Sequence, residues 1–458
     1  MHDVIVIGGG SSGIAAALSA REAGAKSVCV IEEKLLGGDC PHEACVPSKV
    51  LLASAKLYHK MAHEGGMFGV EAKSLSFDFA RVIKRKTAVV NLITGNEKRL
   101  EKYLEMQKID VVKGRAYFVD ASTIRVGARV LKSKAFVIAT GSVDITPPIH
   151  GIEETPYLTY ADVTKLKKLP SSIAIIGAGP VGTEMATFFA EVGVKTALLQ
   201  IAPHILPRED EELSVLAEAR LRTLGVSVLT KTIALGLKKE RKGIRLTYQT
   251  GKSPRKTMFV EKVLIASGKR PNVANLHLEA AGIKEENGKI ELAPTLRTKA
   301  KNIFVAGDAS SHLAFTHTAH YEGSIAGFNA ANVSKPKSMQ SVELGIVPRV
   351  TFTDPELASV GLTAQEAALA GHDIRILKTP LGVLGRAAVD GRREGMLKII
   401  VEKKTDLILG AHMFGERSGE VIHEVALAMR TGVTAAVLQS GIRAYPTYSE
   451  GISLAQEL

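Results

Sequence analysis

Apolar runs that end in glycine turns dominate the pattern of this 458-residue chain. Residues 4–7 are all β-branched and predict a buried strand, and residues 14–23 are rich in alanine and predict a helix. A glycine-rich turn lies between them, and a second strand is predicted over residues 27–31, ending at Glu32. A strand, a glycine turn, a helix and a second strand in this order are typical of a fold that binds a dinucleotide.

The same order of elements returns far along the chain. Residues 173–176 predict a strand, a glycine turn follows, and a helix extends to about residue 192. Residues 196–199 then predict a second strand, which ends at Gln200. Two openings of this kind so far apart indicate two separate dinucleotide-binding folds and not a repeated solenoid.

The rest of the chain predicts further helices and an α+β tail. Residues 53–104 read as helical, and two strand-like stretches precede a strand at residues 136–139. After a polar stretch near Pro336, strands and helices alternate at residues 350–352, 364–370, 397–401, 408–413 and 420–431. This tail has the size and the pattern of an independent domain.

Composition fits a globular chain, because apolar residues make up 45% and charged residues 23%. The formal net charge is +12, but its basic clusters are scattered without interleaved aromatic residues. We therefore expect solvated surface, with neither nucleic acid nor membrane as a partner, and the role of the charge stays open. Three cysteines, no recognisable signal peptide and no apolar stretch of ~20 residues predict a soluble cytoplasmic protein.

The first glycine turn carries the motif Gly8-x-Gly10-x-x-Gly13. Its glycines permit a tight turn and a close approach of backbone to ligand, and the N-terminus of the following helix faces a pyrophosphate. Glu32, at the end of the next strand, provides a carboxylate that accepts hydrogen bonds from ribose hydroxyls. Strand, helix and acid together make this a specific sign of a dinucleotide site.

The second glycine turn, Gly177-x-Gly179-x-x-Gly182, has the same context, but its second strand ends at Gln200 instead of an acid. An amide does not bind both ribose hydroxyls as a carboxylate does, and it does not repel a 2′-phosphate. The sequence therefore leaves the choice between NADH and NADPH open.

Cys40 and Cys45 flank four residues, Pro41-His42-Glu43-Ala44. If a helix begins at the second cysteine, as the following sequence predicts, the two Cα atoms come within the ~4.4–6.8 Å that a disulfide needs. A helix N-terminus favours the thiolate, and Lys49, one turn further on, adds a cation. We interpret the pair as a redox disulfide. The alternatives are two unrelated buried thiols or a metal pair, but the histidines complete no zinc spacing, so we predict no bound metal.

The segment Gly37-Gly38-Asp39-Cys40-Pro41-His42-Glu43-Ala44-Cys45-Val46-Pro47-Ser48-Lys49 lies between the two glycine turns. With it, the chain resembles the FAD-dependent pyridine nucleotide-disulfide oxidoreductases, which include glutathione reductase, dihydrolipoamide dehydrogenase and mercuric reductase. The resemblance runs almost end to end and includes four further motifs: Ala139-Thr140-Gly141, Gly268-Lys269-Arg270-Pro271-Asn272, Ala306-Gly307-Asp308 and Phe352-Thr353-Asp354-Pro355-Glu356.

The resemblance implies an α/β fold with two Rossmann-like dinucleotide-binding domains and an α+β C-terminal dimerisation domain. The FAD-binding domain would comprise residues 1–146 and 267–335, the NAD(P)-binding domain residues 147–266, and the dimerisation domain residues 336–458. A homodimer is implied, in which the tail completes the active site of the partner subunit.

The resemblance also implies roles for individual residues. In this family the flavin passes electrons from NADPH or NADH to a disulfide by contact. Cys45 would lie on the flavin side, Cys40 would attack the substrate, and Lys49 and Glu184 would form an ion pair beside the flavin N5. The implied cofactor contacts are Glu32 at the adenosine ribose, Asp308 at the ribityl chain, and Gly8, Gly10, Ser12, Gly13, Gly38, Lys49, Thr140, Gly141, Gly177, Gly179, Gly182, Gln200, Gly268 and His317.

One segment near the C-terminus departs from the family pattern. Disulfide-reducing members carry His-Pro-Thr-x-x-Glu there, in which the His is the general acid and base of thiol exchange and the Glu orients it. Here Tyr445 occupies the His position and Glu450 the Glu position. A phenol, with an unperturbed pKa of ~10, is a poor base at neutral pH, and losing acid–base help typically costs ~10²–10⁴-fold. We therefore expect weak turnover of glutathione disulfide or lipoamide unless another group, such as His42, replaces the base.

Mercuric reductases also lack that His, and the segment Phe315-Thr316-His317-Thr318-Ala319 resembles them. They end in a metal-delivering cysteine pair, whereas this chain ends in Ala455-Gln456-Glu457-Leu458 and shows no N-terminal metal-binding domain. Our leading hypothesis is a mercuric-reductase-like NAD(P)H oxidoreductase acting on a thiophilic metal ion, a quinone-like acceptor or an unidentified disulfide. The alternatives are a dihydrolipoamide dehydrogenase and, more remotely, a non-catalytic basic binding or assembly component.

Overall fold

The computed structural model describes residues 1–96 and 98–457, so Leu458 of the tail discussed above lies outside the described residues. The contacts of the backbone divide the chain into two compact units. Unit 1 comprises residues 1–50, 84–145 and 268–343, and unit 2 comprises residues 51–83, 146–267 and those from 344 onward. This division into two units does not test the predicted boundaries of the three domains, which stay a prediction.

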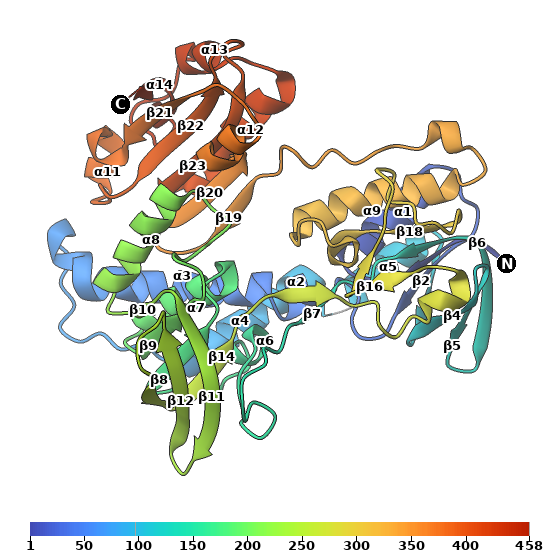
Figure 1. Cartoon of the computed structure of the whole chain (residues 1–458), viewed down its shortest axis with the longest axis horizontal. Coiled ribbons are helices and arrows are strands. Elements are labelled where there is room, and N and C mark those ends of the chain that lie inside the picture. Colours follow the sequence, from blue (N-terminus) through green and yellow to red (C-terminus); the bar gives the residue numbers. More distant parts are fainter. Residues whose placement is uncertain (97, 458) are drawn as a thin grey trace. The chain divides into compact units, whose positions relative to one another are not determined.

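Unit 1 is built on a sheet of strand order β3-β2-β1-β6-β5-β4, in which β18 also pairs with β6 (Figure 1). β3, β2, β1, β18 and the end of β6 run parallel, whereas β4 and β5 form an antiparallel meander with the start of β6. Its strands are β1 (His2–Ile7), β2 (Val28–Glu32), β3 (Ile109–Lys113), β4 (Ala116–Asp120), β5 (Thr123–Val126), β6 (Arg129–Ile138), β7 (Ser142–Asp144), β15 (Lys269–Pro271), β16 (Glu285–Glu286), β17 (Lys289–Ile290) and β18 (Ile303–Val305). Its helices are α1 (Ser11–Glu22), α2 (Asp39–His42), α5 (Lys98–Met106) and α9 (Thr316–Ala331), and the boundary between the units falls within α3 (Cys45–His59) and α4 (Phe79–Thr94).

The central strands of unit 1 are buried on both faces, which is why their sequences are continuous apolar runs. Val4 and Val6 of β1 pack into one apolar cluster, and Ile5 and Ile7 pack into a second one on the opposite face. Cys29 of β2 belongs to the second cluster and is fully buried, so it is a core residue.

Helices α1 and α9 pack against each other at unusually short range. A Cβ atom at Gly323 would stand 2.2 Å from the Ser12 carbonyl oxygen, and one at Gly327 would stand 2.1 Å from the Ala16 carbonyl oxygen. Only glycine at these two positions of α9 lets its backbone approach that of α1, and this contact holds the start of α1 in place.

Unit 2 contains three sheets. A parallel sheet has the order β10-β9-β8-β14, an antiparallel one the order β11-β12-β13, and a larger antiparallel one the order β19-β20-β23-β22-β21-β24. The strands are β8 (Ser172–Ile176), β9 (Lys195–Leu199), β10 (Ser227–Leu229), β11 (Thr232–Glu240), β12 (Gly243–Thr250), β13 (Lys256–Val260), β14 (Lys262–Ile265), β19 (Arg349–Thr351), β20 (Glu356–Gly361), β21 (Ile374–Pro380), β22 (Met396–Glu402), β23 (Ile408–Gly415) and β24 (Gln456–Glu457). The α-helices are α6 (Tyr160–Val163), α7 (Pro180–Glu191), α8 (Glu211–Thr223), α10 (Ala364–Leu369), α11 (Gly385–Val389), α12 (Ser418–Thr431), α13 (Ala435–Ser440) and α14 (Glu450–Ser453), and a π-helix, η1, covers Lys60–Glu64.

The elements predicted around both glycine turns are confirmed, and the helix predicted after Cys45 is α3. The prediction of two strands between residues 104 and 136 was wrong, because β3, β4 and β5 all precede the apolar part of β6. The short turn between β4 and β5 left too little polar sequence to separate them. Strands β11, β12 and β13 were not predicted, since their basic residues read as solvated surface.

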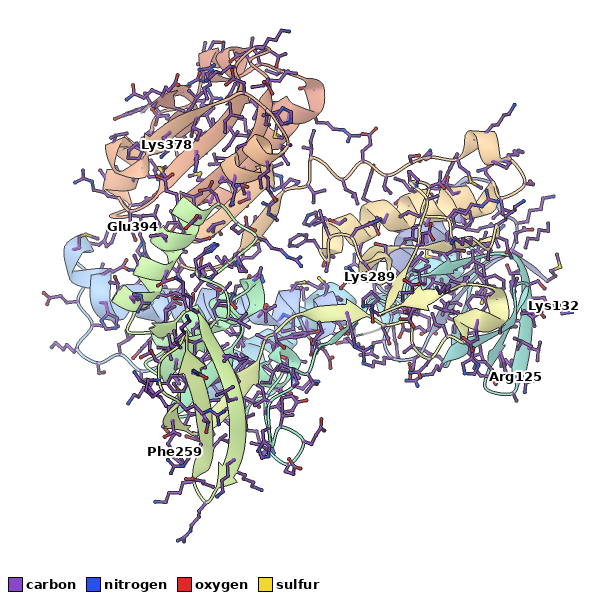
Figure 2. The ribbon with its side chains drawn as sticks, in the orientation of Figure 1. Arg125, Lys132, Phe259, Lys289, Lys378 and Glu394 are labelled. Atoms are coloured by element: carbon purple, nitrogen blue, oxygen red, sulfur yellow. The ribbon has the colours of Figure 1, made fainter. Side chains whose placement is uncertain are left out.

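Charged side chains lie on the surface of unit 1. Figure 2 shows Arg125 and Lys132 of unit 1, both exposed, with their side chains directed away from the ribbon. Within residues 1–96 and 98–457, every helix is too short or too polar to cross a lipid bilayer.

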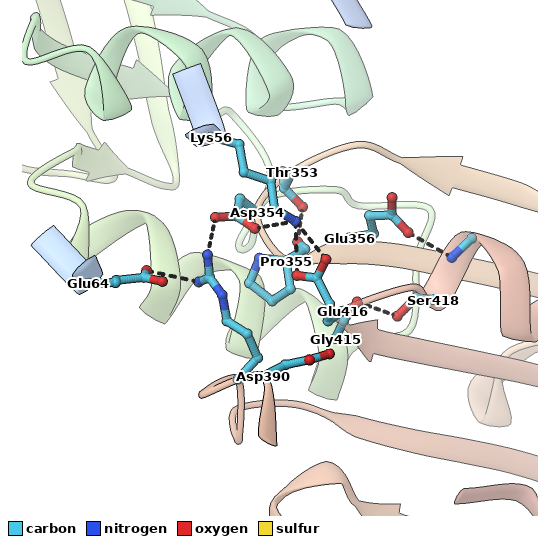
Figure 3. A network of polar contacts seen from close by, with 12 residues as sticks. Lys56, Glu64, Thr353, Asp354, Pro355, Glu356, Asp390, Gly415, Glu416 and Ser418 are labelled. Carbon is cyan, nitrogen blue, oxygen red and sulfur yellow. Dashed lines mark hydrogen bonds and ion pairs between the residues drawn. The ribbon is translucent and has the colours of Figure 1, made fainter. Parts of the chain in front are cut away.

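A buried ionic network connects distant segments of unit 2 (Figure 3). The Lys56 ammonium of α3 lies 2.9 Å from the Asp354 carboxylate and 2.8 Å from the Glu416 carboxylate. The Arg392 guanidinium donates to the other Asp354 oxygen at 2.8 Å and pairs with Glu64 of η1 at 3.3 Å. Asp354 is 3% exposed, so its carboxylate lies out of contact with water while it pairs with Arg392 and with the partly exposed Lys56. The network joins the second half of α3 to the C-terminal sheet of the same unit.

Candidate active site

The first glycine turn joins β1 to α1. A Cβ atom at Gly13 would stand 1.8 Å from the carbonyl oxygen of Gly8, and Gly8 itself has a φ of +109°. Both positions therefore require glycine, and the helix begins at Ser11 with its first N–H groups directed out of the turn. Such a helix start is a ready site for the negative charge of a pyrophosphate.

Glu32 is located at the end of β2 and contacts this turn directly. Its Oε2 accepts from the Gly9 N–H at 2.7 Å, and its Oε1 accepts from the Lys34 N–H at 2.6 Å. A carboxylate has about four acceptor positions, so both oxygens can still accept from ribose hydroxyls. Glu32 thus holds the glycine turn and remains able to bind the sugar.

Three loops meet at the glycine turn within unit 1. A Cβ atom at Gly38 would stand 2.9 Å from the Gly10 Cα, so the segment before the thiols passes directly over the turn. On another loop, Asp308 Oδ2 accepts from the Ser142 hydroxyl at 2.6 Å. Thr140, whose carbonyl accepts from the Asn272 side chain at 3.3 Å, follows the end of β6.

These loops offer polar atoms that suit a bound FAD. The hydroxyl oxygens of Thr140, Ser311 and Thr318 are buried and have no hydrogen-bond partner within residues 1–96 and 98–457. A buried hydroxyl is ordinarily hydrogen-bonded, so these three atoms, two on loops and Thr318 in the first turn of α9, fit a polar ligand. Together with the space that only glycine leaves at Gly13, they indicate that the residues present fit the dinucleotide.

Cys45 occupies the helix start that the sequence predicted, and Cys40 lies in a short helix that it did not predict. Cys40 lies in α2, Cys45 is the first residue of α3, and both are partly exposed. The structure describes them as free thiols, the reduced state of such a pair. A hydrogen bond to Cys45 and burial raise the pKa of Cys40, whereas Thr316 and Lys49 act in the opposite direction. The two thiols therefore lie next to each other, and the loss of a proton from one depends on the protonation of the other.

Thr316 and His42 also contact the thiol segment, and they differ in what they contribute. The Thr316 hydroxyl, at the start of α9, lies 3.5 Å from the Cys45 sulfur. The ring Nε2 of His42 donates to the Leu36 carbonyl at 2.9 Å, so this imidazole fixes the turn before α2. The sequence marked Thr316 only as part of the segment that resembles mercuric reductases, and spacing gave no sign of its contact with Cys45, because the two are far apart in sequence.

Unit 2 contains the second glycine turn. A Cβ atom at Gly182 would stand 1.8 Å from the Gly177 carbonyl oxygen, the same close contact as in the first turn. Gln200 follows β9 and is buried, and its Oε1 accepts from the Ile201 N–H at 2.9 Å. The Gln200 amide therefore stabilises its own loop, and the preference between the two nicotinamide cofactors stays open.

The remaining predicted residues have these positions. Glu184 of α7 is buried and accepts from the Phe352 N–H at 3.0 Å, within unit 2. Lys49 belongs to the part of α3 in unit 1, so the ion pair with Glu184 stays a prediction. The ring of His317, in the first turn of α9, stacks on Phe315 with 5.4 Å between centroids. Gly268, also in unit 1, accepts from the Ile145 N–H at 2.9 Å.

The C-terminal segment presents an exposed phenol. Tyr445 is 78% exposed, and Glu450 Oε2 accepts from the Thr447 N–H at 2.8 Å. Glu450 therefore holds the turn that carries Tyr445, in the place where the family pattern uses it to orient a histidine. Across the described part of the chain, no group of three His, Cys, Asp or Glu side chains is placed to bind a metal ion.

Two glycine turns that suit dinucleotides, together with a thiol pair at helix starts, define a two-nucleotide redox enzyme. Comparison with known proteins agrees with this class. Residues 2–323 match the family of pyridine nucleotide-disulphide oxidoreductases, and residues 347–456 match the dimerisation domain of the same family.

The chain is similar to relatives of two kinds. It is 36% identical to a dihydrolipoyl dehydrogenase of Geobacillus stearothermophilus over 453 residues, which cover 98% of this chain and 94% of that protein. It is 33% identical to a mercuric reductase of Lysinibacillus sphaericus over 458 residues, which cover 99% of this chain and 82% of that protein. Among solved structures, the HOCl-induced flavoprotein disulfide reductase RclA from Escherichia coli superposes with a TM-score of 0.86 at 30% identity, covering 99% of both chains.

The chain therefore belongs to the pyridine nucleotide-disulfide oxidoreductase family. It is an enzyme of that class, a flavoprotein that uses FAD and NAD(P)H, and its fold combines the two nucleotide-binding regions with a C-terminal dimerisation domain. The dimerisation domain supports a homodimer. The relatives do not agree on the electron acceptor.

Proposed function

We propose that this enzyme passes electrons from NADPH or NADH through FAD and the Cys40–Cys45 pair to a thiophilic metal ion or another non-glutathione acceptor. The observation that carries the proposal is the residue at position 445. Disulfide-reducing members of the family have their acid–base histidine there, whereas this chain has Tyr445, which is 78% exposed. Glu450 is retained and hydrogen-bonded, so the segment keeps its turn while it lacks the imidazole.

The choice of acceptor follows from the protons that each reaction needs. Reduction of a disulfide substrate releases a thiolate, which is a better leaving group when an acid protonates it. A soft metal ion binds thiolates directly and needs no such proton. A site with paired thiols and a phenol in place of the imidazole therefore favours a metal ion over a disulfide.

Within this proposal, the residues of the chain mainly hold the redox groups in line. FAD, when bound, accepts a hydride from the nicotinamide and delivers two electrons to the disulfide. Glu32 and the glycine turn orient its adenosine half, and Asp308 orients its ribityl chain. Cys45 faces the flavin, Cys40 meets the acceptor, and Lys49 stabilises negative charge beside the flavin.

A dihydrolipoamide dehydrogenase is the second candidate. The 36% identity to the enzyme of Geobacillus stearothermophilus favours it. It would need another group to act as the base in place of Tyr445, and His42 is the histidine nearest the thiols in sequence. Its ring Nε2 donates to Leu36, so in this arrangement only Nδ1 is left to act as the base.

Rates of NADPH and NADH oxidation with different acceptors test the proposal. The purified holoenzyme is assayed with lipoamide, with thiol-complexed Hg(II) and with Cu(II), because a Cu(II) complex of the related Escherichia coli enzyme has been solved. We expect a metal-dependent rate that Cys40→Ser abolishes, and negligible turnover of lipoamide. Fast lipoamide turnover by the wild-type enzyme would reject the proposal in favour of the dehydrogenase.

Tyr445→His provides the matched variant. If the phenol is what limits disulfide chemistry, the imidazole should raise lipoamide turnover by roughly 10²-fold or more, with an optimum near neutral pH. Tyr445→Phe is the control and should leave lipoamide turnover as low as in the wild-type enzyme. Equal lipoamide rates in the His and Phe variants would show that residue 445 does not set the acceptor.

A further inference from the structure

Glu322 is a buried carboxylate that binds both ends of one turn in unit 1. It lies in α9 and is 1% exposed. Its Oε2 accepts from the Gly307 N–H at 2.8 Å, and its Oε1 accepts from the His312 ring Nδ1 at 2.7 Å. Residues 307–312 therefore form a turn whose first and last residues share one partner.

The turn between these two bonds carries Asp308. The Asp308 carboxylate accepts from Ser142 at 2.6 Å, which fixes its side chain toward the start of β7. The backbone of this turn is strained at Ser311, a residue other than glycine with a φ of +66°. A non-glycine residue at positive φ costs energy that the surrounding contacts have to outweigh. The two bonds to Glu322 are contacts of this kind.

Charge makes the His312 bond stronger than an ordinary one. Glu322 is buried, so a negative charge there needs a partner, and the His312 side chain is 34% exposed beside it. The hydrogen bond to Glu322 raises the pKa of His312, against the opposing effect of burial. When His312 is protonated, its bond to the Glu322 carboxylate is charge-assisted and stronger than a neutral one.

We propose that His312 and Glu322 are positioning residues of the flavin site: by clamping residues 307–312 they hold Asp308 in the geometry that binds FAD. This inference rests on the proposed contact between Asp308 and the ribityl chain. Neither His312 nor Glu322 belongs to a motif that the sequence reveals, because their only sign is the contact itself.

The affinity of the apoprotein for FAD tests the clamp. FAD is titrated into apoprotein while the quenching of flavin fluorescence is followed, and the thermal midpoint of the apoprotein is measured separately. We expect His312→Gln and Glu322→Gln to raise the Kd for FAD about tenfold or more, since each removes a charged hydrogen bond. His312→Lys, which keeps a cationic donor, should restore most of the affinity.

The chain offers a matched control in unit 2. His372 Nδ1 is 2.5 Å from Glu402, and its side chain is 36% exposed, nearly as His312 is. His372→Gln should lower the thermal midpoint of the apoprotein by a similar amount and leave the Kd for FAD unchanged. A Kd within twofold of wild type in His312→Gln, with the same thermal loss as His372→Gln, would overturn the proposal.

Asp308→Asn tests the contact between Asp308 and FAD separately from the clamp formed by His312 and Glu322. If the Asp308 assignment is right, this variant raises the Kd for FAD at least as much as His312→Gln does. A normal Kd in Asp308→Asn would show that the flavin assignment of Asp308 is wrong, and the clamp would then lose its stated role. A raised Kd in Asp308→Asn beside a normal one in both clamp variants would overturn the clamp alone.

Discussion

Glu32 illustrates how one side chain can serve both the fold and a ligand. Its two oxygens accept from the N–H groups of Gly9 and Lys34, so the carboxylate fixes the turn that the pyrophosphate would face. The neighbouring Glu33 is 47% exposed and only pairs with Arg115 on the surface. Adjacent acids of the same strand end thus have very different surroundings.

We expect Glu32→Ala to weaken FAD binding by roughly tenfold or more, because two charge-assisted bonds to the turn are lost together with the ribose acceptor. Glu33→Ala is the matched control and should bind FAD as the wild-type protein does. Titration of both apoproteins with FAD gives the two dissociation constants. Equal constants would contradict the role assigned to Glu32.

Glu191 is a buried acid outside the proposed chemistry. It is 1% exposed, and burial first and Asp354 second raise its pKa to about 9, against the attraction of Arg220 and Lys56. The folded chain therefore keeps this proton at neutral pH, whereas an unfolded chain releases it near pH 4.5. Because the folded state binds the proton more tightly, the free energy of unfolding should fall as pH rises between these two values.

Glu191→Gln removes this titration and keeps the shape of the side chain. We expect the thermal midpoint of the variant, measured relative to wild type, to be higher at pH 8 than at pH 5. Glu291→Gln is the control, since Glu291 is 76% exposed and its loss should have nearly the same effect at both pH values. Scanning calorimetry at the two pH values gives the comparison, and a difference that does not change with pH would contradict the raised pKa.

Helix α9 packs against α1 at very short range. Gly323 leaves no room for a side chain, because a Cβ there would stand 2.2 Å from the Ser12 carbonyl oxygen of α1. We expect Gly323→Ala to lower the free energy of unfolding by ~1–3 kcal/mol, as forced overpacking does, and to shift α1 away from the FAD site. Gly66→Ala is the control, since a Cβ there meets nothing within 4 Å. Denaturant unfolding measures both, and equal losses would contradict the packing argument.

An element could be predicted where the contact that requires it also fixes a local sequence pattern. Gly13 and Gly182 could be found, because each must avoid a carbonyl five residues earlier and the fixed spacing follows from that contact. The strand β1 could be found because burial on both faces requires a continuous apolar run. The hairpin of β11 and β12 could not, since half of its side chains face solvent.

The candidate site divides in the same way. Cys40, Cys45 and Glu32 lie close in sequence to the elements that position them, so motif spacing was enough to find them. Thr316 and Glu322 lie beside the site only because α9 packs across α1, a contact between segments about 300 residues apart. A single sequence carries no local pattern for such contacts.

The ionic network around Asp354 holds together segments of unit 2 that are far apart in sequence. It links α3, η1 and the C-terminal sheet through side chains that are far apart in sequence (Figure 3). Burial acts to raise the pKa of Asp354, but Lys56 and Arg392 outweigh it and leave the pKa lowered. The stabilisation by this carboxylate is therefore present at neutral pH and is lost as the pH falls below 3.8, its ordinary value, toward the lowered one.

Asp354→Asn should leave the buried Arg392 cation and the partly exposed Lys56 with one counter-charge fewer, so we expect the free energy of unfolding to fall by ~3–5 kcal/mol. Glu291→Gln, which breaks an exposed pair with Lys299, should cost less than about 1 kcal/mol. A double-mutant cycle with Lys56→Met isolates the contact, because the double variant should lose less than the sum of the two single losses. The coupling should also change little between low and high salt, because dissolved ions screen buried and partly buried charges much less than exposed ones. Additive losses, or a coupling that disappears in high salt, would mean that the network behaves as a surface pair and does not hold α3 to the C-terminal sheet.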